Sequence, residues 1–451
     1  MSPAAAAGGG AGVKGAVQET VSATAGAVRG PRSGGAIEVQ GTTEIGGAIE
    51  TGAVAPEALT APEVEAARGG AAVPLLVLGG SGYVAGEALR LLAGHPGLVV
   101  AGIISESQAG QPIAEAFPHL ASAYPGVRFS ALEELPRLVE LAAEVAAGAA
   151  EAGAGSGRPG NRPASQVAAL CAAPHGVAAK LVDVLLAAAE RAGARLRVVD
   201  LSADFRFSSA AAYEQVYGHP HGAPERLPHF VCALPEHADL APAIEHVAHP
   251  GCFPTVVLLA AVPLVRLGWI EPRLHVVAVT GSTGAGRTPS PTTHHPARRS
   301  NLFAYSPLAH RHEPEMRALA LATAGEPVAI HFVPQAGPFA RGIYATLQAR
   351  LLHPARPGHE AAQAAAIADD LARFYGAAPF VDVTAEPPRL QDVVGSNRCR
   401  IGVAVAGDRL VAFSAIDNLT KGAAGGGIQW LNRMLGFPET AGLTQPGIGW
   451  L

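Results

Sequence analysis

The sequence predicts an α/β protein in which a doubly wound parallel sheet precedes an α+β domain, and three observations favour this fold class. Continuous apolar runs alternate with helix-like stretches between residues 73 and 202. A glycine-rich turn, LGGSGYVAGE, joins the first apolar run to the first helical stretch. After residue 251 the chain carries strand-like runs rich in Val, Ile and Thr, which are typical of a mixed or antiparallel sheet.

The first predicted sheet consists of near-continuous apolar strands, because parallel strands are buried on both faces. The expected strands are 73–78, 98–104, 167–173 and 196–202. Helical stretches beginning near Glu87 and Ala179 separate them. In the second domain, strands are expected to begin at His275, Val328, Gly342, Cys399 and Leu410.

Two low-complexity segments interrupt this pattern. Residues 1–70 are rich in Ala, Gly, Thr and Glu and hold no aromatic residue. Such a segment buries too little apolar surface to offset its ordering entropy, so we expect a disordered extension. A cleaved leader or a partner-binding tail is the alternative. The segment 146–166 is expected to form a surface loop insertion.

Composition excludes several classes of protein. The net charge of −5 argues against broad nucleic-acid binding, which requires clustered Lys and Arg. The longest apolar run, 256–265, is far shorter than the ~20 residues that a membrane span requires. The four cysteines form no CxxC pair, which disfavours a zinc ribbon or a disulfide scaffold. We therefore expect a cytoplasmic protein with reduced thiols and no nucleic-acid or membrane partner.

The glycine-rich turn predicts a dinucleotide-binding site. The spacing Gly79-x-x-Gly82 follows a predicted strand and opens a helix, where backbone N–H groups can approach a pyrophosphate. An ordinary tight turn is the alternative. Ser105, Glu106 and Ser107 end the second strand, where an acid holds a ribose diol and a basic residue holds a 2′-phosphate. The acid indicates NAD, whereas the serines can donate to a phosphate, so both cofactors stay open.

Cys252 is the candidate nucleophile. It follows Pro-Gly and precedes Pro-Thr and an apolar helical run, so we expect its sulfur at a helix N-terminus. There the helix dipole and free N–H groups lower a thiol pKa and can bind an oxyanion. Inert core packing is the alternative for any single cysteine. Cys171 and Cys399 lie in strand-like runs and are expected to be structural, while Cys232 is unassigned.

The segment LAHRHEPEM carries the candidate acid/base. His310 and His312 flank Arg311, and Glu315 can orient the second imidazole if a helix begins there. We expect no metal site, because no third ligand follows at a suitable spacing. An exposed loop is the remaining alternative. Another glycine-rich segment, STGAGR, ends in Arg287, and its N–H groups and guanidinium would suit a phosphate or carboxylate.

Eight segments of the chain, in order, carry a resemblance to one family. They are GGSGYVAGE, APHG, VDLSADFRF, HPGCFPT, STGAGR, HRHEPE, RGIYATL and SAIDNLTKGAAGGGIQWLNRMLGFPETAGL. The chain from about residue 74 to 443 resembles the N-acetyl-gamma-glutamyl-phosphate reductase family, within the aspartate-semialdehyde dehydrogenase and glyceraldehyde-phosphate dehydrogenase group. The resemblance implies a Rossmann-type dinucleotide-binding domain (71–250) and a catalytic and oligomerisation domain of the glyceraldehyde-phosphate dehydrogenase type (251–417). It also implies a C-terminal segment (418–451) that returns to the first domain.

The resemblance also implies roles for individual residues. Cys252 would be the nucleophile, and His312, or its neighbour His310, would be the acid/base with Glu315 beside it. The residues implied to contact the cofactor are Gly79, Ser81, Gly82, Tyr83, Val84, Ser105, Ser107, Pro174, His175, Asn418 and Lys421. Those implied to lie near the substrate are Ser282, Gly284, Arg287 and Arg311. The implied cofactor is NADP, although many members carry an arginine where Glu106 stands, which keeps NAD open.

The activity implied by the resemblance is NADPH-dependent reduction of N-acetyl-gamma-glutamyl phosphate in arginine biosynthesis. A Cys252 thioester would form, phosphate would leave, and N-acetyl-glutamate 5-semialdehyde would be released by a homodimer or homotetramer. The nearest alternative is the sister enzyme of lysine biosynthesis, whose amino-adipyl phosphate is borne on an acidic carrier protein that Arg298 and Arg299 could meet. A cysteine hydrolase or acyltransferase would need no glycine fingerprint, and a catalytically silent dinucleotide-binding protein would need no Cys252.

Overall fold

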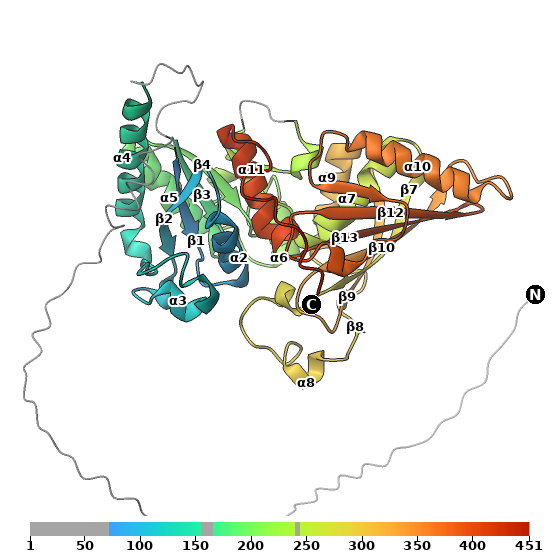
Figure 1. The fold of residues 1–451 in the computed structure, drawn as a ribbon, viewed down its shortest axis with the longest axis horizontal. Helices are drawn as coiled ribbons and strands as arrows, with labels where there is room; N and C mark the ends of the chain where they lie inside the picture. Colours follow the sequence, from blue (N-terminus) through green and yellow to red (C-terminus); the bar gives the residue numbers. More distant parts are fainter. Residues whose placement is uncertain (1–71, 155–165, 240–243, 451) are drawn as a thin grey trace, which may run out of the picture. The chain divides into compact units, whose positions relative to one another are not determined.

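The computed structural model describes residues 72–154, 166–239 and 244–450, so the disordered extension expected for residues 1–70 lies outside the described residues. Two sheets organise the described part of the chain (Figure 1). The first has six strands in the order β2-β1-β3-β4-β6-β5, and the second has seven in the order β11-β12-β13-β10-β7-β9-β8. This arrangement confirms the predicted fold class.

The six-stranded sheet is parallel throughout. Its strands are β1 (Val73–Leu78), β2 (Leu98–Ile104), β3 (Gln166–Cys171), β4 (Arg195–Asp200), β5 (Phe230–Cys232) and β6 (His246–Ala248). The first four agree with the expected apolar runs. The sequence analysis missed β5 and β6, because a strand of three residues is too short to show a hydrophobic period.

Helices cover both faces of this sheet. The helices α2 (Tyr83–Leu92) and α11 (Gly425–Leu435) pack on one face, and α4 (Leu135–Ala154) and α5 (Ala178–Ala192) pack on the other. Figure 1 shows α4 and α11 on opposite sides of the strands. Successive residues of β1 enter the two cores alternately, which explains why the whole strand is apolar.

The loop expected at 146–166 begins later than predicted. Helix α4 continues to Ala154, so the first nine residues of that segment are helical, and residues 155–165 lie outside the described part of the chain. Alanine is the strongest helix former, which explains why an Ala-rich stretch extends the helix. The short elements of this domain are η1 (Glu106–Gln108), α3 (Ile113–Ala116), η2 (Pro118–Leu120), η3 (Leu132–Glu134), α6 (Ala210–Tyr217), η4 (Pro224–His229) and η5 (Pro235–His237).

The seven-stranded sheet is mixed. Its strands are β7 (Ile270–Thr280), β8 (Phe303–Ala304), β9 (Ala329–Ala336), β10 (Ile343–Leu351), β11 (Val381–Thr384), β12 (Cys399–Ala406) and β13 (Arg409–Ile416). The pairs β7–β9 and β11–β12 are parallel, and the other pairs are antiparallel. The remaining elements are α7 (Cys252–Arg266), η6 (Ser282–Ala285), α8 (His295–Arg298), α9 (His312–Ala324), α10 (Glu360–Phe374), η7 (Leu390–Asp392) and the π-helical turn η8 (Thr420–Ala424).

Helix α7 is the centre of the second core. It packs against β7, β10 and β13 on one side and against α9 on another, and every residue from Phe253 to Val265 is buried. This burial explains the longest apolar run in the sequence. Within the described ranges, no helix combines the length and the hydrophobicity needed to cross a bilayer.

A buried ionic cluster joins the two domains at α2. Glu87, on α2, accepts two hydrogen bonds from Arg341 (2.8 and 3.1 Å) and one from the hydroxyl of Thr420 (2.6 Å). Arg341 also donates to Asp417, which follows β13 (2.9 Å). The glycine-rich turn and the second sheet are therefore held together close to the end of β1.

Candidate active site

Cys252 is the first residue of α7, as the sequence predicts. Its N-cap, Gly251, has extended backbone angles, and the first N–H groups of α7 lie at the open end of the helix. The side chain also contacts the C-terminal segment, because a Cβ atom on Gly422 of η8 would lie 2.8 Å from the Cβ of Cys252. The sulfur-bearing residue thus sits where α7 meets the returning end of the chain.

His312 lies directly against the turn that presents Cys252. A Cβ atom on Gly251 would lie only 2.6 Å from His312 Nε2, so only glycine leaves room for the imidazole. His312 is the first residue of α9 and is buried. The Nδ1 atom of His310 accepts a hydrogen bond from the backbone N–H of His312 (3.2 Å). This arrangement favours His312 as the acid/base and His310 as its neighbour.

The protonation states of this pair differ from the expectation. Burial lowers the pKa of His312 well below its usual value, and Arg206 lowers it further, so the imidazole is neutral near pH 7. Burial raises the pKa of the Cys252 thiol, and the nearby Arg206 and the N–H of Phe253 offset this only in part. The predicted lowering of the thiol pKa is therefore wrong, because desolvation of the thiolate outweighs the helix end. The neutral imidazole can accept a proton, but both pKa shifts oppose its transfer from the thiol in the free enzyme.

Glu315 does not orient the imidazole, contrary to the expectation. Its Oε1 accepts a hydrogen bond from the backbone N–H of Gly251 (2.7 Å), and its Oε2 pairs with Arg206 Nη1 (3.2 Å). The Nδ1 atom of His312 is buried and has no hydrogen-bond partner among the described residues. The prediction failed because it used the spacing along one helix, whereas Glu315 points to a turn of another element.

Arg206 is the site residue that the sequence analysis missed. It lies in the loop after β4, in the segment VDLSADFRF, and donates to the carbonyl oxygens of His249 (3.0 Å) and Leu201 (2.9 Å) in addition to Glu315. The one feature of the sequence that could have indicated Arg206 as a site residue is its place in a segment that follows a buried strand. Nothing in the sequence showed that its partner lies 109 positions away.

Arg311 connects the histidine segment to the first domain. Its Nη1 lies 3.3 Å from Nε2 of His175, which follows β3. Burial and the Arg311 charge lower the pKa of His175, so the ring accepts this hydrogen bond in its neutral form. Within the described residues, Arg311 pairs with no carboxylate. An exposed guanidinium beside the catalytic histidine suits an anionic group of a substrate.

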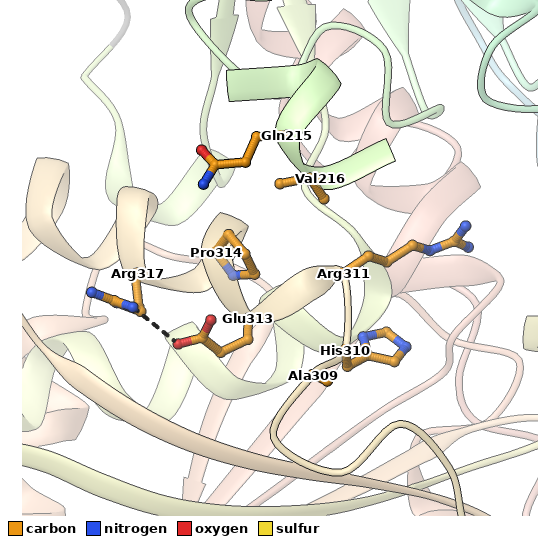
Figure 2. Close-up of a pocket in the computed structure, with 8 residues that line it drawn as sticks. All are labelled: Gln215, Val216, Ala309, His310, Arg311, Glu313, Pro314 and Arg317. Atoms are coloured by element: carbon orange, nitrogen blue, oxygen red, sulfur yellow. Dashed lines mark hydrogen bonds and ion pairs between the residues drawn. The ribbon is translucent and has the colours of Figure 1, made fainter. Parts of the chain in front are cut away.

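A cavity of about 430 Å³ adjoins this segment. It is lined by Gln215 and Val216 of α6 and by Ala309, His310, Arg311, Glu313, Pro314 and Arg317. Figure 2 shows Arg311 and Arg317 extending to opposite sides, with Arg317 paired to Glu313. Neither Cys252 nor His312 lines the cavity. Of the histidine segment, His310 and Arg311 line it beside the candidate base His312.

The glycine-rich turn has the form that a dinucleotide requires. Gly79 has φ +74°, and a Cβ atom there would lie 2.4 Å from the backbone nitrogen of Ala173. Gly82 caps α2, and a Cβ atom there would meet nothing closer than 3.8 Å, so the helix end is open. Ser105 Oγ donates to Ser81 Oγ (3.0 Å), which joins the ends of β1 and β2. These residues fit a pyrophosphate at the N-terminus of α2.

The other residues implied to contact the cofactor lie around the same edge of the sheet. Tyr83 and Val84 are the first two residues of α2, and Pro174 follows β3. Ser107 is exposed in η1. Glu106 is already engaged, because its Oε2 accepts a hydrogen bond from the backbone N–H of Leu132 (3.2 Å).

The STGAGR segment differs from its predicted role as an anion site. The backbone N–H groups of Ser282 and Gly284 already donate to carbonyl oxygens within the second domain. Arg287, expected near the substrate, instead donates to the carbonyl oxygens of Ser81 (3.0 Å) and Ala116 (3.1 Å). The guanidinium thus lies against the dinucleotide loop.

Asn418 and Lys421, both expected at the cofactor, are occupied inside the protein. The amide of Asn418 accepts from the N–H of Gly342 (2.6 Å) and donates to the hydroxyl of Thr283 (3.0 Å). Lys421 is fully buried and pairs with Glu236 and with Gln429 (2.7 Å). The expectation for Lys421 stays a prediction, and its ammonium is fully buried and paired inside the protein. Among the described residues, no group of three His, Cys, Asp or Glu side chains is arranged to hold a metal ion.

Comparisons with known proteins identify the family. Residues 252–418 match the family described as semialdehyde dehydrogenase, dimerisation domain. The chain is 38% identical to N-acetyl-gamma-glutamyl-phosphate reductase from Methanopyrus kandleri over 376 residues, covering 82% of this chain and 98% of that protein. It is 36% identical to the reductase of the same name from Rhodopirellula baltica over 370 residues, covering 81% and 97%.

Solved structures of aspartate semialdehyde dehydrogenases share the fold. The enzyme II structure from Vibrio cholerae has a TM-score of 0.54 at 15% identity, covering 81% of this chain and 98% of that one. The Francisella tularensis structure has a TM-score of 0.53 at 12% identity, covering 80% and 99%. At these identities the likeness describes the fold alone.

Proposed function

Because the chain belongs to the N-acetyl-gamma-glutamyl-phosphate reductase family, we propose that it reduces N-acetyl-gamma-glutamyl phosphate to N-acetyl-glutamate 5-semialdehyde, with release of phosphate, in arginine biosynthesis. The observation that carries the proposal is the placement of His312 Nε2 over Gly251, immediately before Cys252. This pair lies at the N-terminus of α7, where the first N–H groups can receive an oxyanion.

The first half of the reaction forms an acyl-enzyme. Neutral His312 takes the proton of the Cys252 thiol, and the thiolate attacks the carbonyl carbon of the acyl phosphate. The carbonyl oxygen becomes an oxyanion, which the N–H groups of Cys252 and Phe253 stabilise. When the carbonyl re-forms, the bond to the phosphate oxygen breaks, and phosphate leaves with the bonding electron pair. A thioester on Cys252 and a protonated His312 remain.

The second half returns the enzyme to its starting state. When bound, reduced nicotinamide supplies the hydride that brings the thioester to the oxidation level of the aldehyde. The oxyanion attached to Cys252 then re-forms a carbonyl and expels the thiolate. Protonated His312 gives its proton back to that sulfur, so the thiol and the neutral imidazole are restored. The raised thiol pKa favours this return of the proton to sulfur and opposes its removal in the first half.

We propose that the glycine-rich turn holds the cofactor and that the cofactor is NADP. The open end of α2 and the Ser81 loop would receive the pyrophosphate. Two observations favour NADP over NAD: the Glu106 carboxylate is engaged by Leu132, and the guanidinium of Arg287 lies against the carbonyl of Ser81. One oxygen of the carboxylate that would select a ribose diol is thus engaged elsewhere.

We propose that Arg311 and His175 bind an anionic group of the substrate. Their side chains meet from the two domains, and both are hydrogen-bond donors or can become so near a bound anion. Arg311 directly precedes His312, so an anion held there would place the adjoining acyl group near the catalytic pair.

The alternative substrate, an amino-adipyl group on an acidic carrier protein, loses part of its support. Arg298 was expected to meet the carrier, but it is buried, donates to the carbonyl of Thr280 (3.0 Å) and lies over the ring of Phe303. Only Arg299 of that pair is exposed. The hydrolase alternative has no support from the reductases that the chain resembles.

The family match also supports a homo-oligomer formed through the second domain. One face of the seven-stranded sheet is covered by α7, α9 and α10, while its other face bears exposed or half-exposed residues such as Val277, Tyr344 and Phe413. We propose that two copies pair through this open face. The mass of the full chain in solution, measured by light scattering, tests this directly.

The proposed activity is tested in the oxidative direction. Purified protein is given N-acetyl-glutamate 5-semialdehyde and phosphate, with NADP and NAD in parallel, and nicotinamide absorbance is followed. We expect phosphate-dependent turnover with a preference for NADP. Turnover without phosphate would contradict the acyl-phosphate chemistry, and activity only with the carrier-bound amino-adipyl substrate would select the alternative.

A further inference from the structure

A ring of three hydrogen bonds encloses the turn that precedes Cys252. Arg206 Nε donates to the carbonyl of His249 (3.0 Å), Arg206 Nη1 donates to Glu315 Oε2 (3.2 Å), and Glu315 Oε1 accepts from the N–H of Gly251 (2.7 Å). The Arg206 and Glu315 side chains are only 7% and 1% exposed. We refer to these two side chains as the clasp.

The clasp connects the three elements that build the catalytic pair. Arg206 comes from the loop after β4, Glu315 from the first turn of α9, and the enclosed turn leads into α7. A Cβ atom on Gly251 would lie 2.9 Å from Arg206 Nη1 and 2.6 Å from His312 Nε2. The buried cation and the catalytic base therefore both face the residue next to Cys252.

We propose that the clasp is a positioning and electrostatic device in which Arg206 favours the Cys252 thiolate, Glu315 opposes it, and the two together hold the turn against His312. The proposal rests on the proposed function only in taking Cys252 as the nucleophile. A buried ion pair is seldom retained for stability alone, because desolvating two charges costs about as much as their attraction returns. The position of the Arg206–Glu315 pair beside the reacting sulfur of Cys252 indicates a role in catalysis.

The charges around the sulfur support this division of roles. Arg206, Glu315 and Tyr305 act electrostatically on Cys252, and the rings of His310 and His312 pack against the next residue, Phe253. Arg311, between the two histidines, acts on His312. Burial lowers the pKa of His310 to about 4 and raises that of Tyr305, so both are neutral near pH 7, as is His312. Lys421, on the neighbouring η8, is neutralised by Glu236. The two buried charges of the clasp therefore act on the Cys252 thiol in opposite directions. Arg206 lowers the pKa of the thiol, and Glu315 raises it.

Opposite effects of the two charges provide the test. The rate of Cys252 alkylation by iodoacetamide is measured against pH on the full-length protein, and peptide mass spectrometry assigns the modified cysteine. We expect Glu315→Gln to lower the pH midpoint of Cys252 alkylation and Arg206→Gln to raise it. A shift of about one pH unit changes the thiolate fraction about tenfold below the midpoint.

Two further variants keep the test decisive. The double variant Arg206→Gln/Glu315→Gln leaves no uncompensated buried charge, and its midpoint should lie between those of the single variants. Glu313→Gln removes the same charge from the same helix, where the half-buried Glu313 pairs with the exposed Arg317, and should leave the pH midpoint of alkylation unchanged. If Arg206→Gln does not fold, Glu315→Gln and the double variant decide.

The proposal is overturned if the two single variants shift the pH midpoint of alkylation in the same direction. It is also overturned if folded variants show no shift. Alkylation requires no turnover, so this experiment is independent of the substrate assignment. If the protein fails to reduce the acyl phosphate but its variants show the opposed shifts, the proposal for the clasp stands and the proposed function fails.

Discussion

The Nε2 atom of His312 lies 2.6 Å from the position that a Cβ atom would occupy on Gly251. His312 and the turn that precedes Cys252 are therefore in contact, and their relative position depends on the absence of one methyl group. Gly251 has φ −62°, so a larger residue is excluded by this contact and not by its backbone conformation.

Replacing Gly251 by alanine should displace the imidazole and reduce kcat by about 10²-fold, because a misplacement of about 1 Å in a reacting group has that effect. Steady-state kinetics measures the loss, and circular dichroism checks the fold. Gly94→Ala is the matched control, since a Cβ atom there meets nothing within 4 Å. Equal kinetics in the two variants would contradict the close contact as a catalytic requirement.

Replacing Cys252 by serine should abolish turnover and leave cofactor binding intact. The serine hydroxyl is a much weaker nucleophile than a thiolate and a poorer leaving group from the reduced adduct. Cofactor affinity is read from nicotinamide fluorescence, and turnover from absorbance. Near-normal activity in this variant would rule out the covalent step.

The two histidines should contribute unequally to catalysis. His312→Asn removes the proton acceptor and should lower the rate by about 10²- to 10⁴-fold. His310→Asn removes only the ring that accepts the N–H of His312, so its loss should be much smaller. The kcat values of the two variants make the comparison, and a larger loss at His310 would exchange their roles.

Glu87 should stabilise the protein in a pH-dependent way. Burial raises the pKa of this carboxyl, but hydrogen bonds and charges from Arg90 and Arg341 outweigh that effect and lower it to about 2, from an ordinary 4.5. A lowered pKa stabilises the folded state above the unfolded pKa, and this contribution disappears as the pH falls from about 4.5 through about 2. Glu87→Gln should therefore cost about 3 kcal/mol near neutral pH and progressively less in acid.

Urea denaturation of the wild type and of Glu87→Gln across this pH range measures that difference. The exposed pair Arg137–Glu140 supplies the control, and Glu140→Gln should change the free energy of unfolding by less than about 0.5 kcal/mol. A difference for Glu87→Gln that stays constant down to about pH 2 would contradict the linkage.

Arg287 should affect cofactor binding, and Lys421 should affect stability. Lys421→Met leaves Glu236 buried without a partner and should lower the melting temperature, with cofactor affinity of the folded protein unchanged. Arg287→Gln removes a cation beside Ser81 and should weaken NADP binding with little change in stability. Thermal melts and fluorescence titrations distinguish the two outcomes, and a reversed pattern would restore the expected role of Lys421.

The parts of this protein that the sequence predicted are those with local signals. The strands of the first sheet are visible as apolar runs, and the helix beginning at His312 is visible from the acids in its first turn. Burial of polar residues has no such signal: the resemblance places Lys421 at the cofactor, yet its side chain is fully enclosed. The partnership of Arg206 with Glu315 depends on tertiary packing between residues far apart in the sequence, which one chain without homologues does not reveal.

Helix α11 has a consequence for how this protein is made. It covers β3 and β4 with the buried side chains of Ile428, Trp430 and Leu431, yet it is translated after every strand of both sheets. The growing polypeptide must therefore keep this apolar face of its first sheet uncovered until α11 has been synthesised, and exposed surface of this kind favours aggregation. Premature termination before residue 425 should yield insoluble protein and not merely an inactive enzyme.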